Sequence, residues 1–187
     1  MKLYALCDAS SLRKQNLSLQ GFVDLANKHD AEIIQYRNKD DDPQIVKSEL
    51  LQLRKIWHKF LIINDYVEYV SFCDGVHLGQ EDLLRYGTTP EDAVAKIRKV
   101  IEKDKILGIS THNKAEIIQA NHLDLNYIGL GAFRPTSTKD VTNILGDSLD
   151  NLASLSDFPV GAIGGVQLSD TFEHVTYLVI GSDLYEN

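Results

Sequence analysis

The sequence contains a short segment whose polar residues suit the binding of phosphate groups. It reads Ile33-Ile34-Gln35-Tyr36-Arg37-Asn38-Lys39, and the alternation of an extended strand places Gln35, Arg37 and Lys39 on one face. On an exposed sheet these three side chains would simply be solvated. In a strand covered on both faces, three large polar groups in line need a ligand or a partner, because burying them alone is costly. The segment therefore favours an anion-binding site.

Two carboxylates follow other apolar segments. Asp65 ends the run Ile62-Ile63-Asn64-Asp65, and Asp82 ends the run from Gly75 to Asp82. Both have an ordinary explanation, since Asn and Asp are favoured at helix N-caps and acids are common in a first helical turn. At neighbouring strand ends beside a basic strand, however, they could hold Mg²⁺ against a pyrophosphate.

Two histidines lie close to these segments. The run Gly108-Ile109-Ser110-Thr111-His112-Asn113 has the residues of a helix cap, and His112 could be an acid or a base, given an unperturbed pKa of about 6.5. His77 lies inside an apolar run, which favours a packed residue over a ligand.

Three later segments combine glycine, hydroxyls and a cation. The stretch from Gly129 to Lys139 includes Thr136, Ser137 and Thr138, which describes either a polar surface loop or a phosphate clamp. Gly164-Gly165 and Gly181-Ser182 end two further apolar runs. These glycines match the phosphate site that (β/α)₈ barrels often build after their seventh and eighth strands.

Short apolar runs alternate with amphipathic stretches and supply the elements that would position these residues. Helical spacing is clearest at 16–29, 43–58, 89–102 and 114–121, and seven intervening segments can hold helices. The eight strand candidates are 2–7, 32–36, 60–63, 75–78, 106–109, 126–130, 159–163 and 177–180.

This repeat predicts one compact α/β domain over residues 1–187, a TIM-type (β/α)₈ barrel. Nearly all-apolar strands separated by helices indicate a parallel sheet covered on both faces, and eight such strands close most simply into a barrel. An open doubly wound sheet is the alternative. The chain of 187 residues is short for a barrel, so the last helix is expected to be missing or vestigial. The resulting apolar strip between the first and seventh helices would favour a homo-oligomer.

Composition limits the partners of such a domain. The chain has 19 Lys and Arg against 27 Asp and Glu, a net charge of −8, which argues against a general nucleic-acid or anionic-membrane surface. No apolar run reaches transmembrane length, and the first residues do not form a signal peptide. The cysteines, Cys7 and Cys73, both in apolar runs, suit a reducing cytoplasm better than a disulfide framework.

Taken in order, these motifs resemble thiamine-phosphate synthase from about Lys2 to Ser182. The most discriminating pieces are Gly-Gln-Glu-Asp at 79–82 and Thr-x-Thr-Lys at 136–139. Members of that family are Mg²⁺-dependent transferases that join hydroxymethylpyrimidine diphosphate to a thiazole phosphate and release pyrophosphate. The resemblance implies diphosphate contacts from Gln35, Arg37, Lys39, Asn64 and Lys139, Mg²⁺ on Asp65 and Asp82, Ser110 near the pyrimidine, and a thiazole phosphate site from Thr136, Thr138, Gly165 and Ser182.

The sequence departs from that family in one loop and leaves two alternatives open. Ala132 stands where the family usually has Pro, and Arg134 stands where it has an apolar or aromatic residue. One alternative is thiazole tautomerase, a related barrel enzyme in which a residue like His112 would be the acid and base. The other is a non-catalytic ligand sensor of the thiamine pathway. The intact charged set favours the synthase over both, because buried charges need a ligand.

Overall fold

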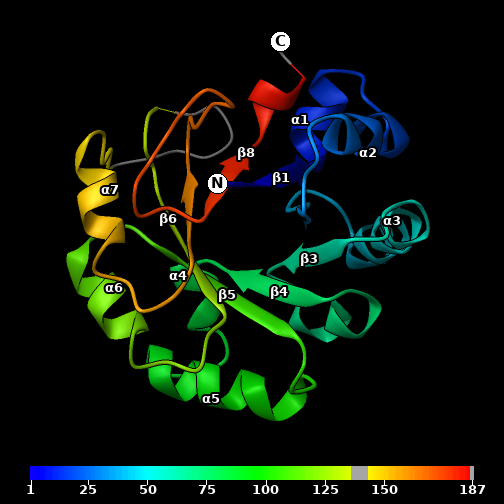
Figure 1. Cartoon of the computed structure of the whole chain (residues 1–187). Helices are drawn as coiled ribbons and strands as arrows, with labels where there is room; N and C mark the ends of the chain where they lie inside the picture. Colours follow the sequence, from blue (N-terminus) through cyan, green and yellow to red (C-terminus); the bar gives the residue numbers. More distant parts are fainter. Residues whose placement is uncertain (136–142, 186–187) are drawn as a thin grey trace.

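A computed structural model of the chain describes residues 1–135 and 143–185. Its eight parallel strands form one closed barrel in sequence order, β1 to β8, with β8 paired to β1 (Figure 1). The barrel confirms the predicted fold class and excludes the open sheet. The strands are β1 (Lys2–Asp8), β2 (Ile33–Arg37), β3 (Phe60–Asn64), β4 (Gly75–Leu78), β5 (Ile106–Thr111), β6 (Tyr127–Gly131), β7 (Val160–Ile163) and β8 (Tyr177–Ile180).

The helices surround these strands (Figure 1). The four predicted helices each begin at a side-chain cap. Ser18 accepts a hydrogen bond from Gly21 N, Asp42 from Gln44 N, Thr89 from Asp92 N and Asn113 from Glu116 N. The α-helices are α1 (Ala9–Lys14), α2 (Leu19–Lys28), α3 (Pro43–Ile56), α4 (Gln80–Leu83), α5 (Pro90–Val100), α6 (Lys114–Ala120) and α7 (Ser148–Ala153), with 3₁₀ turns η1 (Val67–Phe72) and η2 (Ser182–Leu184).

The apolar side chains divide into two layers. The larger cluster fills the space between the strands and the helices, where Trp57, Phe22 and Tyr36 are almost fully buried. The smaller cluster lies inside the barrel and consists of Tyr4, Leu6, Ile33, Ile62, Tyr127 and Val179. The interior is thus a packed core at this level, and the open space is left to the strand ends.

Two of the segments between strands lack the α-helix that the repeat pattern allowed. Strands β3 and β4 are joined through η1, and the segment from Gly164 to Thr176 contains turns and bends. After β8 the described residues contain η2 and no α-helix.

The apolar strip expected between the first and seventh helices is not present in the described residues. Leu168, Phe172 and Tyr185 are partly buried and pack against the core. In the part of the chain that the structure describes, the exposed large hydrophobic side chains are scattered over other parts of the surface. They are Met1, Ile45, Leu51, Phe60, Leu84, Val100, Ile118 and Ile144. This removes the sequence-based reason for expecting a homo-oligomer.

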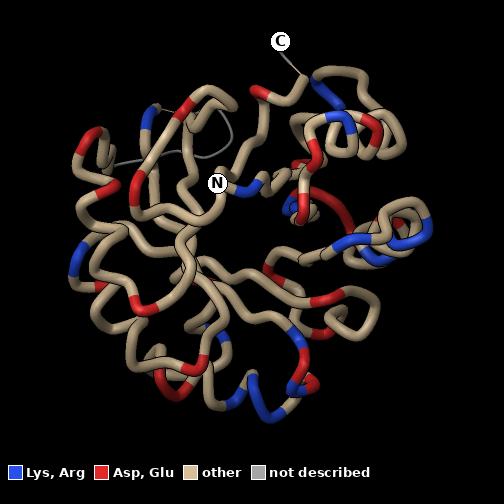
Figure 2. Tube along the Cα trace, in the orientation of Figure 1, with Lys and Arg blue, Asp and Glu red and all other residues tan. Residues whose placement is uncertain are grey.

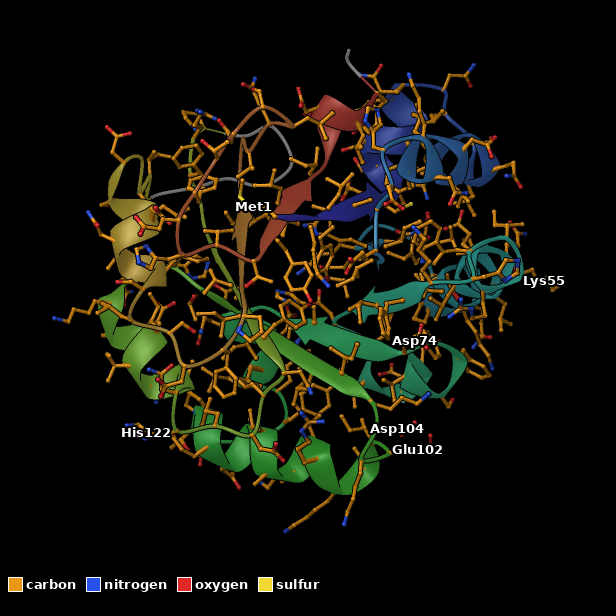
Figure 3. All side chains as sticks on the ribbon, in the orientation of Figure 1. Met1, Lys55, Asp74, Glu102, Asp104 and His122 are labelled. Carbon is orange, nitrogen blue, oxygen red and sulfur yellow. The ribbon has the colours of Figure 1, made fainter. Side chains whose placement is uncertain are left out.

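Opposite the strand ends, the loops that precede the strands form the other rim of the barrel. The six residues labelled in Figure 3 all belong to segments that lead into strands. Among them, Asp74 accepts hydrogen bonds from Arg54 Nη1 and Leu61 N at 2.8 and 2.7 Å, which ties the end of α3 to the start of β3 and β4. This rim therefore serves stability, as is usual at the amino-terminal face of a barrel.

Charge and cysteine placement agree with the composition. Lys and Arg are interspersed with Asp and Glu around the outer helices, while the central strands carry few charges (Figure 2). Cys7 and Cys73 are both buried free thiols, and burial raises the pKa of Cys73 to about 11. Within residues 1–135 and 143–185, no helix is both long and apolar enough to cross a membrane.

Candidate active site

A cavity of about 780 Å³ opens at the carboxyl ends of the strands. This is the end at which barrel enzymes bind their substrates, because the loops that follow the strands converge there. The nine described residues predicted for the site all line it: Gln35, Arg37, Lys39, Asn64, Asp65, Asp82, Ser110, Gly165 and Ser182. Residues far apart in the sequence are thus brought to one surface.

Lys39 lies between the two predicted metal-binding carboxylates. Its Nζ is 2.9 Å from Asp65 Oδ2 and 3.0 Å from Asp82 Oδ2. The carboxylate side chains are 9% and 10% exposed, while that of Lys39 is 43% exposed. Arg85 Nη2 approaches the other oxygen of Asp82 at 3.2 Å. Two nearly buried carboxylates thus share one flexible ammonium group.

This crowding changes how the three groups bind protons. Burial raises the pKa of Asp65 and outweighs the opposing effect of Lys39. For Asp82 burial also acts upward, but the hydrogen bond and charge of Lys39, with Asp65 and Arg85, bring its pKa below the usual value. For Lys39 burial acts downward, and its two carboxylate partners raise its pKa overall.

The carboxylate pair fits a Mg²⁺ ion that also binds substrate phosphates. Asp65 Oδ1 is buried and has no hydrogen-bond partner among the described residues, so a hard acceptor oxygen remains available. The same part of the chain contains no cluster of three or more His, Cys, Asp or Glu residues suited to a metal. Mg²⁺ is commonly held by one or two carboxylates, with phosphate and water oxygens as the other ligands. Asp65 and Asp82 would be the protein ligands of such an ion.

Arg37 is held at the cavity by a residue from the neighbouring strand. Its Nη1 forms an ion pair with Asp8 Oδ2, and Asp8 is the last residue of β1. The other carboxylate oxygen, Oδ1, caps α1 by accepting from Ser11 N at 2.9 Å. Because Asp8 is almost fully buried, its ion pair fixes the position of the Arg37 guanidinium group.

The polar side chains inside the barrel mouth bond to each other. Gln35 and Asn64, both predicted to contact the diphosphate, are buried and joined by a 2.8 Å hydrogen bond. Ser110 Oγ lies 3.0 Å from His77 Nε2, and His77 is a buried residue of β4, as its apolar surroundings suggested.

His112 also lines the cavity, from the short connection between β5 and α6. Its Nδ1 is 2.9 Å from Glu116 Oε2, and its backbone N donates to the same oxygen at 2.8 Å. The Asn113 side chain caps α6, so the cap that the sequence allowed is realised by Asn113, while His112 faces the cavity.

The loops after β6 and β7 are fastened together. Arg134, which stands where the related family has an apolar residue, makes a two-pronged ion pair with Asp170 at 2.6 and 2.8 Å. The same guanidinium donates to Gly165 O at 3.0 Å. The family departure at Arg134 therefore has a structural role, because it joins the β6 loop to the β7 loop. Ala132 is also buried, and its backbone oxygen accepts a hydrogen bond from Leu145 N at 2.8 Å.

Three predicted site residues cannot be placed. Thr136, Thr138 and Lys139 lie outside the described residues. Their neighbours Ala132, Pro135 and Asn143 line the cavity on either side of that gap.

Gly165 is a position where the close packing of these loops needs glycine. Its φ is +65°, and a Cβ there would lie 2.7 Å from Arg134 Cβ and 2.9 Å from Pro135 O. We expect Gly165→Ala to lower the free energy of unfolding by about 1–3 kcal/mol, through backbone strain and this overlap, and to raise KM for a phosphorylated substrate. Denaturant unfolding and steady-state kinetics measure the two effects.

Gly146→Ala is the matched control for that change. Gly146 has a φ of +50°, but no atom lies within 4 Å of the position of its Cβ. It should therefore show the strain without the overlap and without the change in KM. Equal losses of unfolding free energy in the two variants would mean that the contact between the β6 and β7 loops does not contribute to stability.

Sequence reasoning missed Asp8, Tyr4 and Tyr127. Asp8 had a usable signal, because it is a charged residue at the end of an apolar strand. The same signal identified the candidate residues at the ends of the other strands. Tyr4 and Tyr127 had none, because each is an aromatic residue in an apolar run and only the barrel interior reveals a role for its hydroxyl.

Residues 3–179 match the family described as Thiamine monophosphate synthase. The thiamine-phosphate synthase of Persephonella marina is 32% identical over 172 residues, covering 89% of this chain and 77% of that protein. That of Lawsonia intracellularis is 37% identical, covering 72% of this chain and 61% of the relative. That of Clostridium acetobutylicum is 32% identical, covering 88% and 76%.

Solved structures with the same fold include a thiamine phosphate pyrophosphorylase from Pyrococcus furiosus. It superposes with a TM-score of 0.75 at 22% identity, covering 97% of this chain and 85% of that one. A geranylgeranylglyceryl phosphate synthase from Thermoplasma acidophilum gives a TM-score of 0.66 at 14% identity. Both likenesses show the barrel alone.

Proposed function

This chain belongs to the thiamine-phosphate synthase family and is a transferase of thiamine biosynthesis, and we propose that it joins hydroxymethylpyrimidine diphosphate to a thiazole phosphate. Thiamine phosphate and pyrophosphate would be the products. The observation that supports this proposal is the cluster of Lys39, Asp65 and Asp82 beside Arg37 in one cavity. A diphosphate leaving group needs both cations and a metal site, and this cluster offers both.

The proposed roles follow the placement of each residue. Arg37 and Lys39, with Lys139 from the loop after β6, would bind the diphosphate, while Asp65 and Asp82 would hold its Mg²⁺. Gln35 and Asn64 would support this region from inside the barrel. Ser110 would contact the pyrimidine, and the thiazole phosphate would bind Gly165 and Ser182, together with Thr136 and Thr138.

The reaction requires no protein nucleophile. The bond between the pyrimidine methylene carbon and the diphosphate oxygen breaks, and the leaving group keeps the electron pair. The thiazole nitrogen then forms a new bond to that carbon with its lone pair. When bound, Mg²⁺ neutralises charge on the diphosphate oxygens. Arg37 and Lys39 would donate hydrogen bonds toward the same growing charge, and exclusion of water from the site would protect the cation.

Purified protein tested with both substrates and Mg²⁺ decides the proposal. We expect thiamine phosphate and pyrophosphate to form in equal amounts, detected by chromatography and by a pyrophosphate-release assay. Binding of the substrates without turnover would identify the ligand sensor, and isomerisation of a thiazole carboxylate phosphate would identify the tautomerase.

The proposed enzyme would act in the cytoplasm on small phosphorylated substrates. The support for this compartment is that both described cysteines are buried free thiols, which suits a reducing environment.

A further inference from the structure

A group of polar side chains lies on the outer side of β2, behind the two cations of the site. We call it the outer polar cluster, and its members are Tyr36, Asn38 and Asp41, with Arg13 from α1 and Glu49 from α3. Arg37 and Lys39 alternate with Tyr36 and Asn38 along the chain and line the cavity on the opposite face. Asn38 is only 3% exposed. A buried polar side chain is costly unless it is paired, so its surroundings need an explanation.

Asn38 is the centre of this cluster. Its Nδ2 lies 2.7 Å from Asp41 Oδ2 and 3.1 Å from Glu49 Oε2. The hydroxyl oxygen of Tyr36 is 3.0 Å from the same nitrogen. The Asn38 Oδ1 accepts from the backbone N atoms of Asp40 and Asp41, at 3.3 Å each. Both ends of one amide are thus used, because the oxygen closes the turn after β2 and the NH₂ group ties that turn to α3.

The surroundings permit only one orientation of the Asn38 amide. A backbone N–H can only donate, so the atom that faces the N atoms of Asp40 and Asp41 must be the oxygen. The nitrogen then faces the carboxylates of Asp41 and Glu49, which are acceptors. The hydrogen bond from Asn38, together with Arg13, holds the pKa of Asp41 below its usual value, although burial acts upward. The amide is therefore fixed at both ends.

The turn that Asn38 closes carries Lys39. Pairing of β2 with its neighbours ends at Arg37, so Lys39 lies two positions beyond the sheet. The far side of the turn is held by α1, since Arg13 forms an ion pair with the Asp41 carboxylate. The backbone of Lys39 is therefore positioned by the turn and not by strand pairing.

We propose that Asn38 is a positioning residue, which fixes the turn after β2 so that Lys39 reaches the diphosphate. The identity of that ligand rests on the proposed function. The Lys39 side chain is 43% exposed, and a fixed backbone reduces the conformational freedom that it loses when it binds a phosphate oxygen. Arg37 is held separately by Asp8, so the loss of Asn38 should act through Lys39. Asn38 thus strengthens diphosphate binding without touching the ligand.

Binding of inorganic pyrophosphate in the presence of Mg²⁺ tests this inference without either substrate. We expect Asn38→Ala to raise the dissociation constant about tenfold in calorimetry, because the hydrogen bonds that order the turn are lost. If Asn38→Ala does not fold, Asn38→Ser serves instead, since its hydroxyl can accept from the backbone of the turn but has no NH₂ group for the carboxylates. An unchanged dissociation constant contradicts the inference.

A double-mutant cycle shows whether Asn38 acts through Lys39. Lys39→Ala alone should weaken pyrophosphate binding about tenfold to a hundredfold, since it removes a hydrogen bond to a charged group. In that background Asn38→Ala should weaken binding by less than about twofold more, because the side chain that it positions is gone. An equal loss in both backgrounds would show that Asn38 has a merely structural role.

Steady-state kinetics give an independent readout. Asn38→Ala should raise KM for the pyrimidine diphosphate about tenfold and leave KM for the thiazole phosphate unchanged, because Lys39 is assigned to the diphosphate alone. Equal rises in the two KM values contradict the inference. Absence of thiamine phosphate synthesis by a wild-type protein that binds pyrophosphate contradicts the proposed function alone. A wild-type protein that binds no pyrophosphate contradicts both.

Asn121→Ala is the matched control. The Asn121 amide is also used at both ends, since its Nδ2 donates to Leu155 O at 2.8 Å and its Oδ1 accepts from Asp157 N at 3.0 Å. It joins the segments that lead into β6 and β7, at the rim opposite the cavity. Its variant should lose stability in thermal unfolding and keep the wild-type affinity for pyrophosphate. A loss of affinity equal to that of Asn38→Ala would overturn the inference.

Discussion

Asp65→Asn and Asp82→Asn are each expected to lower turnover about a hundredfold or more while leaving the fold intact. Both carboxylates line the cavity and share Lys39, and stabilisation of a leaving diphosphate by a metal is worth several kcal/mol. Turnover should be measured across a Mg²⁺ titration. Each variant should need more Mg²⁺ than the wild-type protein, because one of its two protein ligands has lost its charge.

Stability should respond differently from activity. The pKa of Asp65 is raised in the folded protein because of burial, so its ionisation at neutral pH opposes folding. Asp65→Asn removes that cost, and its unfolding midpoint should equal or exceed that of the wild-type protein. Thermal unfolding without Mg²⁺ makes this comparison.

Asp92→Asn supplies the control, since Asp92 is the same residue type on the outer helix α5, paired with Lys96. Its turnover should match the wild-type value. Full wild-type activity in excess chelator would exclude the metal site, and a large loss of stability in Asp65→Asn would show that its carboxylate is mainly structural.

The second large effect is expected at the cations. Arg37→Ala and Lys139→Ala should each lower thiamine phosphate formation by about 10²–10³, which is the usual loss when one transition-state donor is removed. His112→Ala should have a much smaller effect, because no side-chain proton transfer limits the departure of the diphosphate. Single-turnover kinetics with saturating substrates would separate this loss from weaker binding.

A tautomerase would show the reverse order. Its barrier is proton movement on the thiazole ring, where a positioned acid or base contributes about 10²–10⁴. The contact of His112 with Glu116 at 2.9 Å in the cavity would suit that role. An inactive His112→Ala protein beside a nearly active Lys139→Ala protein would therefore identify the tautomerase. Lys96→Ala, on the outer surface of α5, controls for the simple loss of a positive charge.

The strands and most of the helices could be predicted because their signals are local. Gly75–Leu78 and Tyr177–Ile180 are the predicted strands without change, and α5 (Pro90–Val100) lies inside its predicted range. An apolar run, a cap or a proline acts over a few residues, so the sequence contains the whole cause. The position of a polar residue at the end of a strand is also a local signal. In a closed barrel the carboxyl ends of the strands meet at one cavity, so these charged residues could be assigned to it.

The missing helix between β7 and β8 and the buried apolar residues beside β8 could not be predicted in this way. Leu168 and Phe172 stand four positions apart, a spacing that would suit a helix, yet the segment forms turns and bends. What buries these side chains is the surface left by neighbouring elements. The same applies to Arg134, whose partner Asp170 lies 36 positions along the chain.

The sequence by itself therefore determined which chemical groups reach the strand ends, and the tertiary structure alone decided how those groups are paired. Lys39 became the bridge between two carboxylates, Asp8 became the partner of Arg37, and Tyr4 met Tyr127 across 123 residues. The physical reason is that hydrogen bonds and ion pairs act over about 3 Å, and only barrel closure with a fixed strand register sets which distant side chains lie within that range.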